Sequence, residues 1–199
     1  EYNAAISILK ETESEKMYTA AYNNCLGSIN FKKNDYKKSL DYYQKALVAG
    51  KEIEDPNSIS LTNMMMAYIH FVRSSFQEAN DTADSALAIA ESLDDKEIAS
   101  IVSLMKAKIL IKESNYAKAR DFINKALTYS EMFDNNKLKM ITYLNLAILA
   151  ELQNDKAEYD KWFSMVKAKD DFNCIINGKI AQDRVENLFK ELIEEISRM

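Results

Sequence analysis

The chain of 199 residues contains little glycine, proline, histidine or cysteine: 3 Gly, 1 Pro, 1 His and 2 Cys. A sheet protein of this size needs many tight turns, and tight turns favour glycine and proline. Their scarcity therefore predicts long helices joined by short polar loops. Two isolated cysteines and a single histidine provide neither a disulfide framework nor the usual ligands of a zinc site. No apolar run approaches the roughly 20 residues of a membrane-spanning helix.

The charge balance narrows the classes of function further. The formal net charge is -5, and a nucleic-acid surface needs clustered Lys and Arg, so we expect no direct nucleic-acid binding by this domain. The hydrophobic content of 47% is too high for intrinsic disorder. The chain opens at Glu1 without a signal segment, which predicts a fragment or processed product of a larger protein. The sequence does not determine the cellular compartment: the cytoplasm is favoured, and a periplasmic sensor portion is the alternative.

A 40-residue period runs through the chain. Small residues recur at this spacing in one column, an aromatic column follows nine residues later, and two further columns complete the pattern. The four columns are Gly27, Ala67, Ala107, Ala147; Tyr36, Phe76, Tyr116, Lys156; Ser39, Ala79, Ala119, Tyr159; and Ala46, Ala86, Ala126, Val166. A small residue in mid-helix lets a second helix approach closely, and a helix pair that cannot bury both faces must stack on the next pair. The predicted helices lie near 17–32, 35–51, 58–73, 76–92, 96–113, 116–132, 136–153 and 156–169.

These columns resemble the tetratricopeptide repeat (TPR) family. Leu26-Gly27, Tyr36, Ser39 and Ala46 match its motif best, and the resemblance covers about residues 17–169. It implies an all-α, right-handed superhelical solenoid of antiparallel helix pairs. The period of 40 departs from the usual 34, but longer-helix members exist, including the kinesin light chain type and bacterial peptide-pheromone receptors. HEAT-type repeats also run near 40 residues, yet they lack the Leu-Gly and Ala-x6-Ala columns.

The predicted organisation is a single TPR-like solenoid domain over residues 1–199. Its parts are a remnant helix of a preceding repeat (1–14), three repeats (17–56, 57–94, 95–134), a degenerate fourth repeat (135–172) and a capping helix (179–198). The last part rests on an apolar stripe at i, i+3, i+4, i+7, i+8 and i+11 that starts at Val185. A cap covers the last repeat of a solenoid. The alternatives for this helix are dimerisation or a lead into an effector domain.

The motifs of catalysis and of cofactor binding are missing. The sequence contains no GxGxxG or GxxxxGK[ST] phosphate loop and no calcium-binding loop. His70 falls in a column where the family places a packing aromatic, so its expected role is structural. We therefore expect no enzyme activity, no catalytic residues, no metal and no cofactor.

The resemblance implies instead a partner-binding groove, because the first helix of each pair lines the concave wall in this family. Helical phase places the following residues there: Asn24, Ser28, Met64, Met65, Tyr68, Phe71, Met105, Lys108 and Asn145. Methionines suit adaptable binding surfaces, and aromatic residues often anchor interfaces. The alternative is that these Met and aromatic side chains are core. The clamp that grips a C-terminal carboxylate in chaperone-binding members is rejected, since most of its equivalent positions, including Met65, Ile101 and Met105, lack the expected character.

The expected function is a protein- or peptide-binding module, the sensing or scaffolding part of a larger bacterial-type regulatory protein. A homodimer is a further option. The alternative is a structural or oligomerisation domain whose groove is occupied by its own C-terminal helix.

Overall fold

The computed structural model describes residues 13–132, 135–168, 174–176 and 179–196. The helices are α2 (Glu13–Lys32), α3 (Tyr36–Glu52), α4 (Pro56–Val72), α5 (Phe76–Ser92), α6 (Lys96–Lys112), α7 (Tyr116–Ser130), α8 (Asn136–Leu152), α9 (Lys156–Lys167) and α10 (Gln182–Ile196). Two short strands, β1 (Ile175–Ile176) and β2 (Lys179–Ile180), precede α10. The remnant helix predicted at 1–14 lies almost wholly outside the described residues.

A 20-residue module underlies the 40-residue period. Helices α3 and α4 each have 17 residues, and three residues link them. The last linking residue caps the next helix, and this position recurs at Asp35, Asp55, Ser75, Asp95, Asn115, Asn135 and Asp155. Most of these side chains accept a hydrogen bond from the backbone of the first helical turn, as Asp95 does from the Ile98 N–H at 3.0 Å.

The residue before six of these caps has a left-handed backbone. Asn34, Glu54, Ser74, Asp94, Ser114 and Asn154 have φ between 53° and 61°. The following N–H then reaches back five residues, as from Asp55 to the Gly50 carbonyl at 3.0 Å. This is the Schellman helix ending, which usually takes glycine because a side chain strains the left-handed conformation. The chain builds these turns from polar residues instead, which is how it manages with so few glycines.

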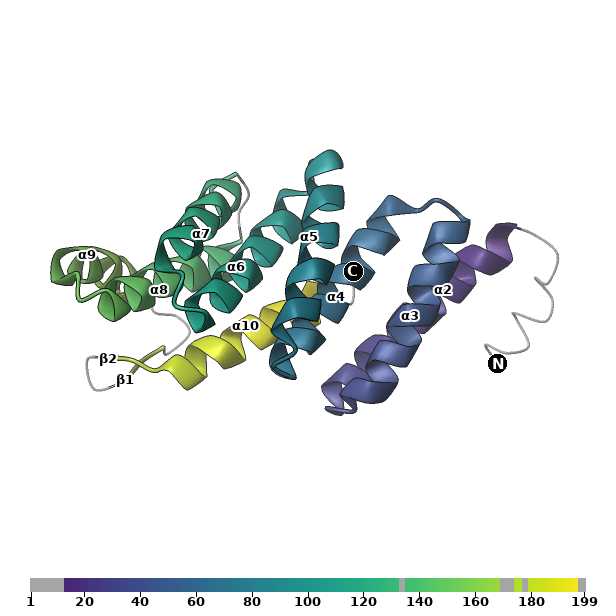
Figure 1. The fold of residues 1–199 in the computed structure, drawn as a ribbon, viewed down its shortest axis with the longest axis horizontal. Helices are drawn as coiled ribbons and strands as arrows, with labels where there is room; N and C mark the ends of the chain where they lie inside the picture. The colour runs from purple at the N-terminus through teal and green to yellow at the C-terminus, as the bar shows by residue number, and fades with distance from the viewer. Residues whose placement is uncertain (1–12, 133–134, 169–173, 177–178, 197–199) are drawn as a thin grey trace. The chain divides into compact units, whose positions relative to one another are not determined.

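Consecutive helices pack as pairs: α2 with α3, α4 with α5, α6 with α7, and α8 with α9 (Figure 1). The predicted all-α architecture of helix pairs is thereby confirmed. The small-residue column lies inside the pairs, where Ala67, Ala107 and Ala147 are fully buried. At Gly27 the Tyr43 ring of the partner helix fills the space in which a side chain would lie.

The described residues fall into two compact units, an N-terminal one with α2–α5 and a C-terminal one with α6–α10. They meet in the chain between Asp94 and Asp95, where the sequence also predicts the boundary between the second and third repeats.

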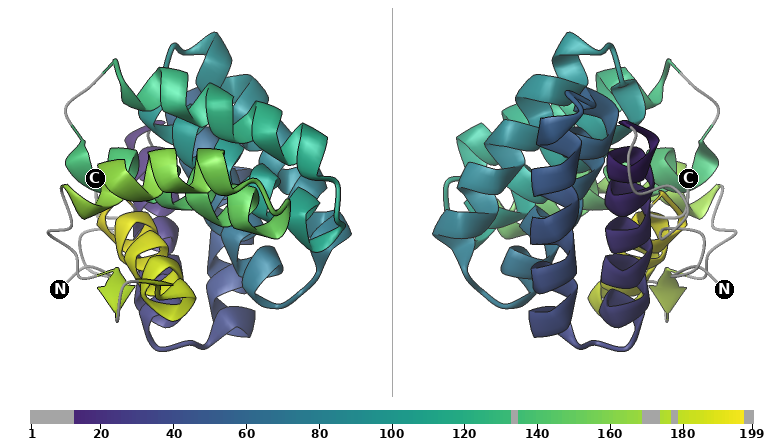
Figure 2. Two further views of the ribbon diagram at one scale, coloured as in Figure 1. Left: turned by 90° about the vertical axis from the view of Figure 1, so that its left-hand side faces the viewer. Right: turned by 90° about the vertical axis from the view of Figure 1, so that its right-hand side faces the viewer.

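The C-terminal helix predicted at 179–198 is present as α10, which packs against α8 in the C-terminal unit (Figures 1 and 2). Its whole predicted stripe is buried: Val185, Leu188, Phe189, Leu192, Ile193 and Ile196. The strand pair before it, in which Ile175 lies opposite Ile180, was not predicted. The Ala181 N–H continues this pairing to the Cys174 carbonyl at 2.9 Å and leads the chain into α10.

Candidate partner-binding surface

In the N-terminal unit, the predicted groove residues are mostly buried. Met64, Met65 and Tyr68 are 0%, 1% and 4% exposed, and Ser28 is also buried. Asn24 and Phe71 are half-buried. Within this unit, these last two are therefore the predicted positions that reach the surface.

Both predicted groove residues on α2, Asn24 and Ser28, make specific contacts. Asn24 joins α2 to α4, because its Nδ2 donates to Ser58 Oγ at 3.3 Å and its Oδ1 accepts from Thr62 Oγ1 at 2.9 Å. The Ser28 and Tyr43 hydroxyls lie 3.0 Å apart. Burial raises the pKa of the Tyr43 hydroxyl, and its hydrogen bond with Ser28 opposes this shift. These contacts fix α2 against its neighbours.

An aromatic cluster holds the ends of α2 and α4. The Phe31 and Tyr68 rings meet edge to face at 5.7 Å between centroids, and Tyr68 stacks on Phe71 at 6.5 Å. Phe71 in turn lies 6.1 Å from Phe76, the first residue of α5. Tyr68 and Phe71 thus form part of a continuous packed row.

The structure reveals an apolar stripe on α2 that helical phase alone did not single out. Met17, Tyr18 and Ile29 are 60%, 48% and 47% exposed, and Cys25 is exposed as well. One repeat later, Ile69 stands in the column of Ile29 and is fully buried. The sequence shows the same apolar character in both places, so the coverage of this column depends on the tertiary structure.

In the C-terminal unit, the predicted residues Met105, Lys108 and Asn145 are all buried, at 1%, 6% and 2% exposed. Asn145 donates from Nδ2 to the Ile141 carbonyl on its own helix at 2.7 Å. Lys108 is different, because its contacts reach α10. Its Nζ lies 2.6 Å from Glu186 Oε1 and 5.1 Å from the centroid of the Phe189 ring.

A second lysine of this unit also pairs with α10. Lys137, at the start of α8, places Nζ 2.6 Å from Glu195 Oε1 and 3.9 Å from Glu191 Oε2. Sequence periodicity identifies neither Lys137 nor a partner for Glu186. The acidic face of α10 was the available signal, but the lysines that meet it are far away in the chain.

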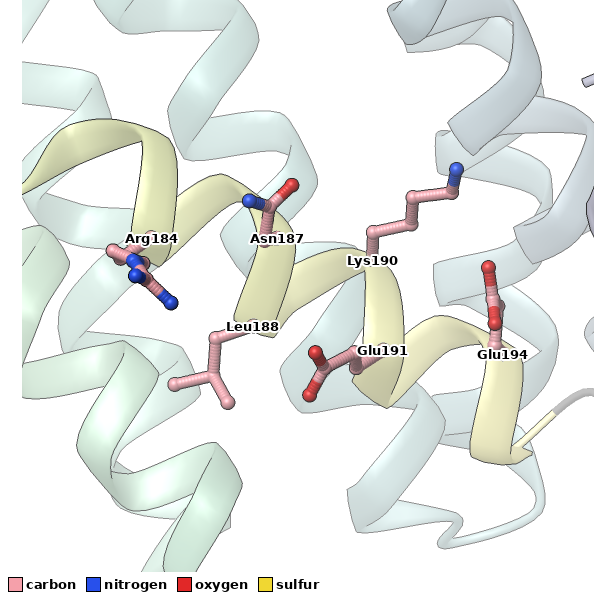
Figure 3. Close-up of a pocket in the computed structure, with 6 residues that line it drawn as sticks. All are labelled: Arg184, Asn187, Leu188, Lys190, Glu191 and Glu194. Atoms are coloured by element: carbon pink, nitrogen blue, oxygen red, sulfur yellow. The ribbon is translucent and has the colours of Figure 1, made fainter. Parts of the chain in front are cut away.

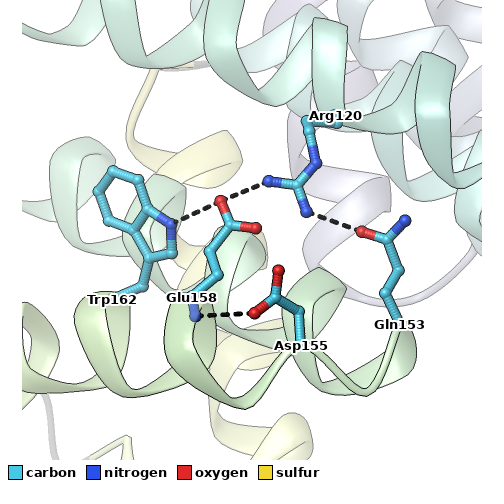
Figure 4. A network of polar contacts seen from close by, with 5 residues as sticks. All are labelled: Arg120, Gln153, Asp155, Glu158 and Trp162. Atoms are coloured by element: carbon cyan, nitrogen blue, oxygen red, sulfur yellow. Dashed lines mark hydrogen bonds and ion pairs between the residues drawn. The ribbon is translucent and has the colours of Figure 1, made fainter.

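A polar network ties α7 to α9 (Figure 4). The Arg120 guanidinium pairs with Glu158 and also donates to Gln153 Oε1 at 2.7 Å. Trp162 Nε1 donates to the same Glu158 oxygen at 3.3 Å. The hydrogen bond from Arg120 is the main cause that holds the pKa of the Glu158 carboxyl below its usual value, with a smaller contribution from Trp162 and with burial opposing. The network stabilises the degenerate fourth repeat, whose aromatic column holds Lys156.

Four further observations bear on possible functions. An open hollow of about 300 Å³ lies along α10 (Figure 3), and its lining is Arg184, Asn187, Leu188, Lys190, Glu191 and Glu194. Burial lowers the pKa of His70. Within the described ranges, no group of three His, Cys, Asp or Glu could hold a metal ion, and none of the helices described is long and apolar enough to cross a bilayer.

No protein-family model matches the sequence, and the comparison with curated proteins finds no match. Solved structures share the fold. BtubC (BKLC) from P. vanneervenii is 16% identical with a TM-score of 0.70, covering 97% of this chain and 82% of that one. RapI in its apo form is 15% identical with a TM-score of 0.70, covering 98% and 56%. Pseudomonas aeruginosa PilF is 16% identical with a TM-score of 0.57, covering 75% and 60%.

These three are TPR-like helical-repeat proteins, and this chain has the same TPR-like fold. The fold prediction is therefore confirmed. The chain spans little more than half of the RapI chain and three fifths of the PilF chain.

Proposed function

We propose that this chain is a protein-interaction module that holds a helical protein segment on the face formed by the first helices of the two repeats in its C-terminal unit, α6 and α8. The observation that carries the proposal is α10 itself. It packs against α8, and its Glu186 pairs with Lys108 of α6, so in the C-terminal unit this face holds a helix. The TPR-like fold supports an interaction scaffold that acts by binding and not by catalysis.

The mode of binding follows from the contacts of α10. An amphipathic helix that lays its apolar side into a groove is a recurring way to recognise a protein segment. The six apolar side chains that α10 buries represent a gross stabilisation on the order of 10 kcal/mol, before the cost of ordering the helix. Such a face can therefore bind a partner helix firmly. The module would serve as the sensing or scaffolding part of a larger regulatory protein.

A second candidate rests on the same observation. If α10 stays on α8 permanently, the chain is a structural or oligomerisation domain whose groove its own C-terminal helix fills. The role of Asn24, Phe71 and the other predicted groove residues remains a prediction under both candidates, as does the homodimer.

A binding experiment with a charge-reversal variant separates the two candidates. Proteins captured from the native source by the wild-type chain are identified, purified and titrated by calorimetry against Lys137→Glu. Lys118→Glu serves as the control, because Lys118 is an exposed lysine on α7. We expect Lys137→Glu to weaken the partner's Kd at least about tenfold and Lys118→Glu to leave it unchanged. Capture of no partner that depends on Lys137 would favour the structural domain.

A further inference from the structure

We infer that the face of α6 and α8 selects acidic amphipathic helices, and that a partner helix of this chemistry replaces α10 on it. This inference rests on the proposed function and specifies the partner. Its first support is Lys108, which is 6% exposed. Both its ion pair, with Glu186, and its cation–π contact, with Phe189, involve α10. A nearly buried ammonium thus depends on the helix that covers it.

Lys137 extends the charge complementarity along the helix. Its side chain is 18% exposed and faces both Glu191 and Glu195. Glu186 and Glu195 are nine residues apart, which corresponds to about 13.5 Å along a helix. The lysine pair, Lys108 and Lys137, therefore binds carboxylates at two places about 13.5 Å apart along the helix.

The choice of charged residues favours exchange over permanent capping. Burying the Lys108 ammonium costs desolvation energy, and ion pairs with exposed carboxylates contribute little stability, so apolar residues of similar size would hold a permanent cap at least as well. Charge complementarity contributes selectivity and faster encounter instead. When α10 leaves, water solvates the lysine pair at little cost, whereas apolar residues at the same two positions would be exposed to water. The carboxylates of Glu186, Glu191 and Glu195 lie at the rim, with side chains 55%, 62% and 54% exposed.

The contacts of α10 define the partner. Counted from Val185 as position i, the occupant needs apolar residues at i, i+3, i+4, i+7, i+8 and i+11. It needs carboxylates at i+1 and i+10, with a further one at i+6, as Glu186, Glu195 and Glu191 provide. The partner is therefore a helix of about three turns or more, apolar on one side and acidic along its edge.

The test uses the full chain and a fluorescent peptide of residues 182–196 as the probe. The variant Phe189→Asp/Ile193→Asp replaces two of the six buried apolar side chains of α10 by carboxylates, to release the helix and free the face. We expect this variant to bind the peptide at least about 100-fold more tightly than the wild type, because a tethered helix competes at an effective concentration in the millimolar range. A scrambled peptide of the same composition should not bind.

The charge requirement is tested with matched partners. A peptide with Glu186→Lys, Glu191→Lys and Glu195→Lys should bind the freed face at least about tenfold more weakly. Adding Lys108→Glu and Lys137→Glu to the freed protein should restore the binding of this Lys-substituted peptide. Equal binding of both peptides, or equal binding to wild type and freed variant, would overturn the inference.

Hydrogen exchange on the unmodified chain gives an answer even if the double variant fails to fold. Exchange of α10 amides while those of α6–α9 stay protected would support replacement of α10. Exchange of α10 together with α8 would show a permanent cap and overturn the inference, as would light-scattering evidence for a dimer that swaps α10 between copies. A natural partner that still depends on Lys137 would in either case leave the proposed function standing.

Discussion

The ring of Tyr43 occupies the space that a side chain at Gly27 would need. A Cβ atom at Gly27 would lie 2.7 Å from Tyr43 Cε1 and 2.8 Å from Cδ1. The Tyr43 hydroxyl meets Ser28, so the ring is held at both ends. One repeat later the same two columns hold Ala67 and Ala83, both buried. The first repeat thus has a large residue on one helix matched by an absent side chain on the other.

Gly27→Ala should destabilise the chain although alanine is the better helix former. Overpacking against a fixed ring costs about 1–3 kcal/mol, and helix propensity returns up to about 1 kcal/mol. We expect a net loss of about 1–2 kcal/mol in urea unfolding. Gly50→Ala is the matched control, because its nearest neighbour, Ile59 Cγ1, would lie 3.4 Å from the new Cβ. Greater stability of both variants would contradict the close approach of Tyr43.

Ser74→Gly should stabilise the turn between α4 and α5. Ser74 has φ of 61°, and a side chain in this left-handed region costs about 1–2 kcal/mol. Glycine removes this strain, but its greater freedom in the unfolded chain offsets part of the gain. The expected gain is about 0.5–1 kcal/mol, measured by thermal unfolding. Asn34→Gly should gain less, because asparagine tolerates this conformation and Asn34 also accepts a hydrogen bond from Tyr36. A loss of stability in Ser74→Gly would argue against a left-handed residue there.

Met65→Glu and Cys25→Glu should differ sharply although the two positions share one repeat column. Met65 is 1% exposed, so a carboxylate there should cost about 3 kcal/mol or more. Cys25 is exposed, and the same substitution there should stay within about 0.5 kcal/mol. Urea unfolding of both variants provides the comparison. If Met65→Glu is tolerated, Met65 belongs to an accessible groove, as predicted from its helical phase.

The Arg120–Glu158 pair should make stability depend on pH in the acidic range. The folded-state pKa of Glu158 lies below its ordinary value of 4.5, so the unfolded state binds the proton more readily. The contribution of the pair is present above pH 4.5 and is lost as the pH falls through the lower, folded-state pKa. The unfolding free energy of the wild type should exceed that of Glu158→Gln by about 1 kcal/mol at neutral pH.

The difference in unfolding free energy between wild type and Glu158→Gln should shrink as the pH falls below 4.5. In an Arg120→Ala background, which removes the main cause of the lowered pKa, the pH dependence of the difference should largely vanish. Unfolding free energies measured across the acidic range provide the check. A constant difference at all pH values would mean that Glu158 acts through packing alone.

The local features of this protein could be predicted from its sequence because each depends on neighbouring residues. The cap residues, such as Asp35 and Asn115, fix helix starts by bonding to backbone groups three residues away. The apolar stripe of α10 follows from helical geometry. The 40-residue period therefore predicted helix pairs and the stripe predicted a C-terminal helix, and the structure contains both. The left-handed turns were less visible, since polar residues stand where glycine usually marks them.

The tertiary structure decided which of the apolar columns are covered and which charges meet. Cys25 and Met65 share a phase, yet one is exposed and the other buried, because coverage depends on what packs against each helix. Lys108 and Glu186 are separated by 78 residues, and no periodicity within a helix relates them. Helical phase can place a side chain on a face, but the partner of that face is set by long-range packing, and here that packing brings an acidic helix onto a pair of lysines.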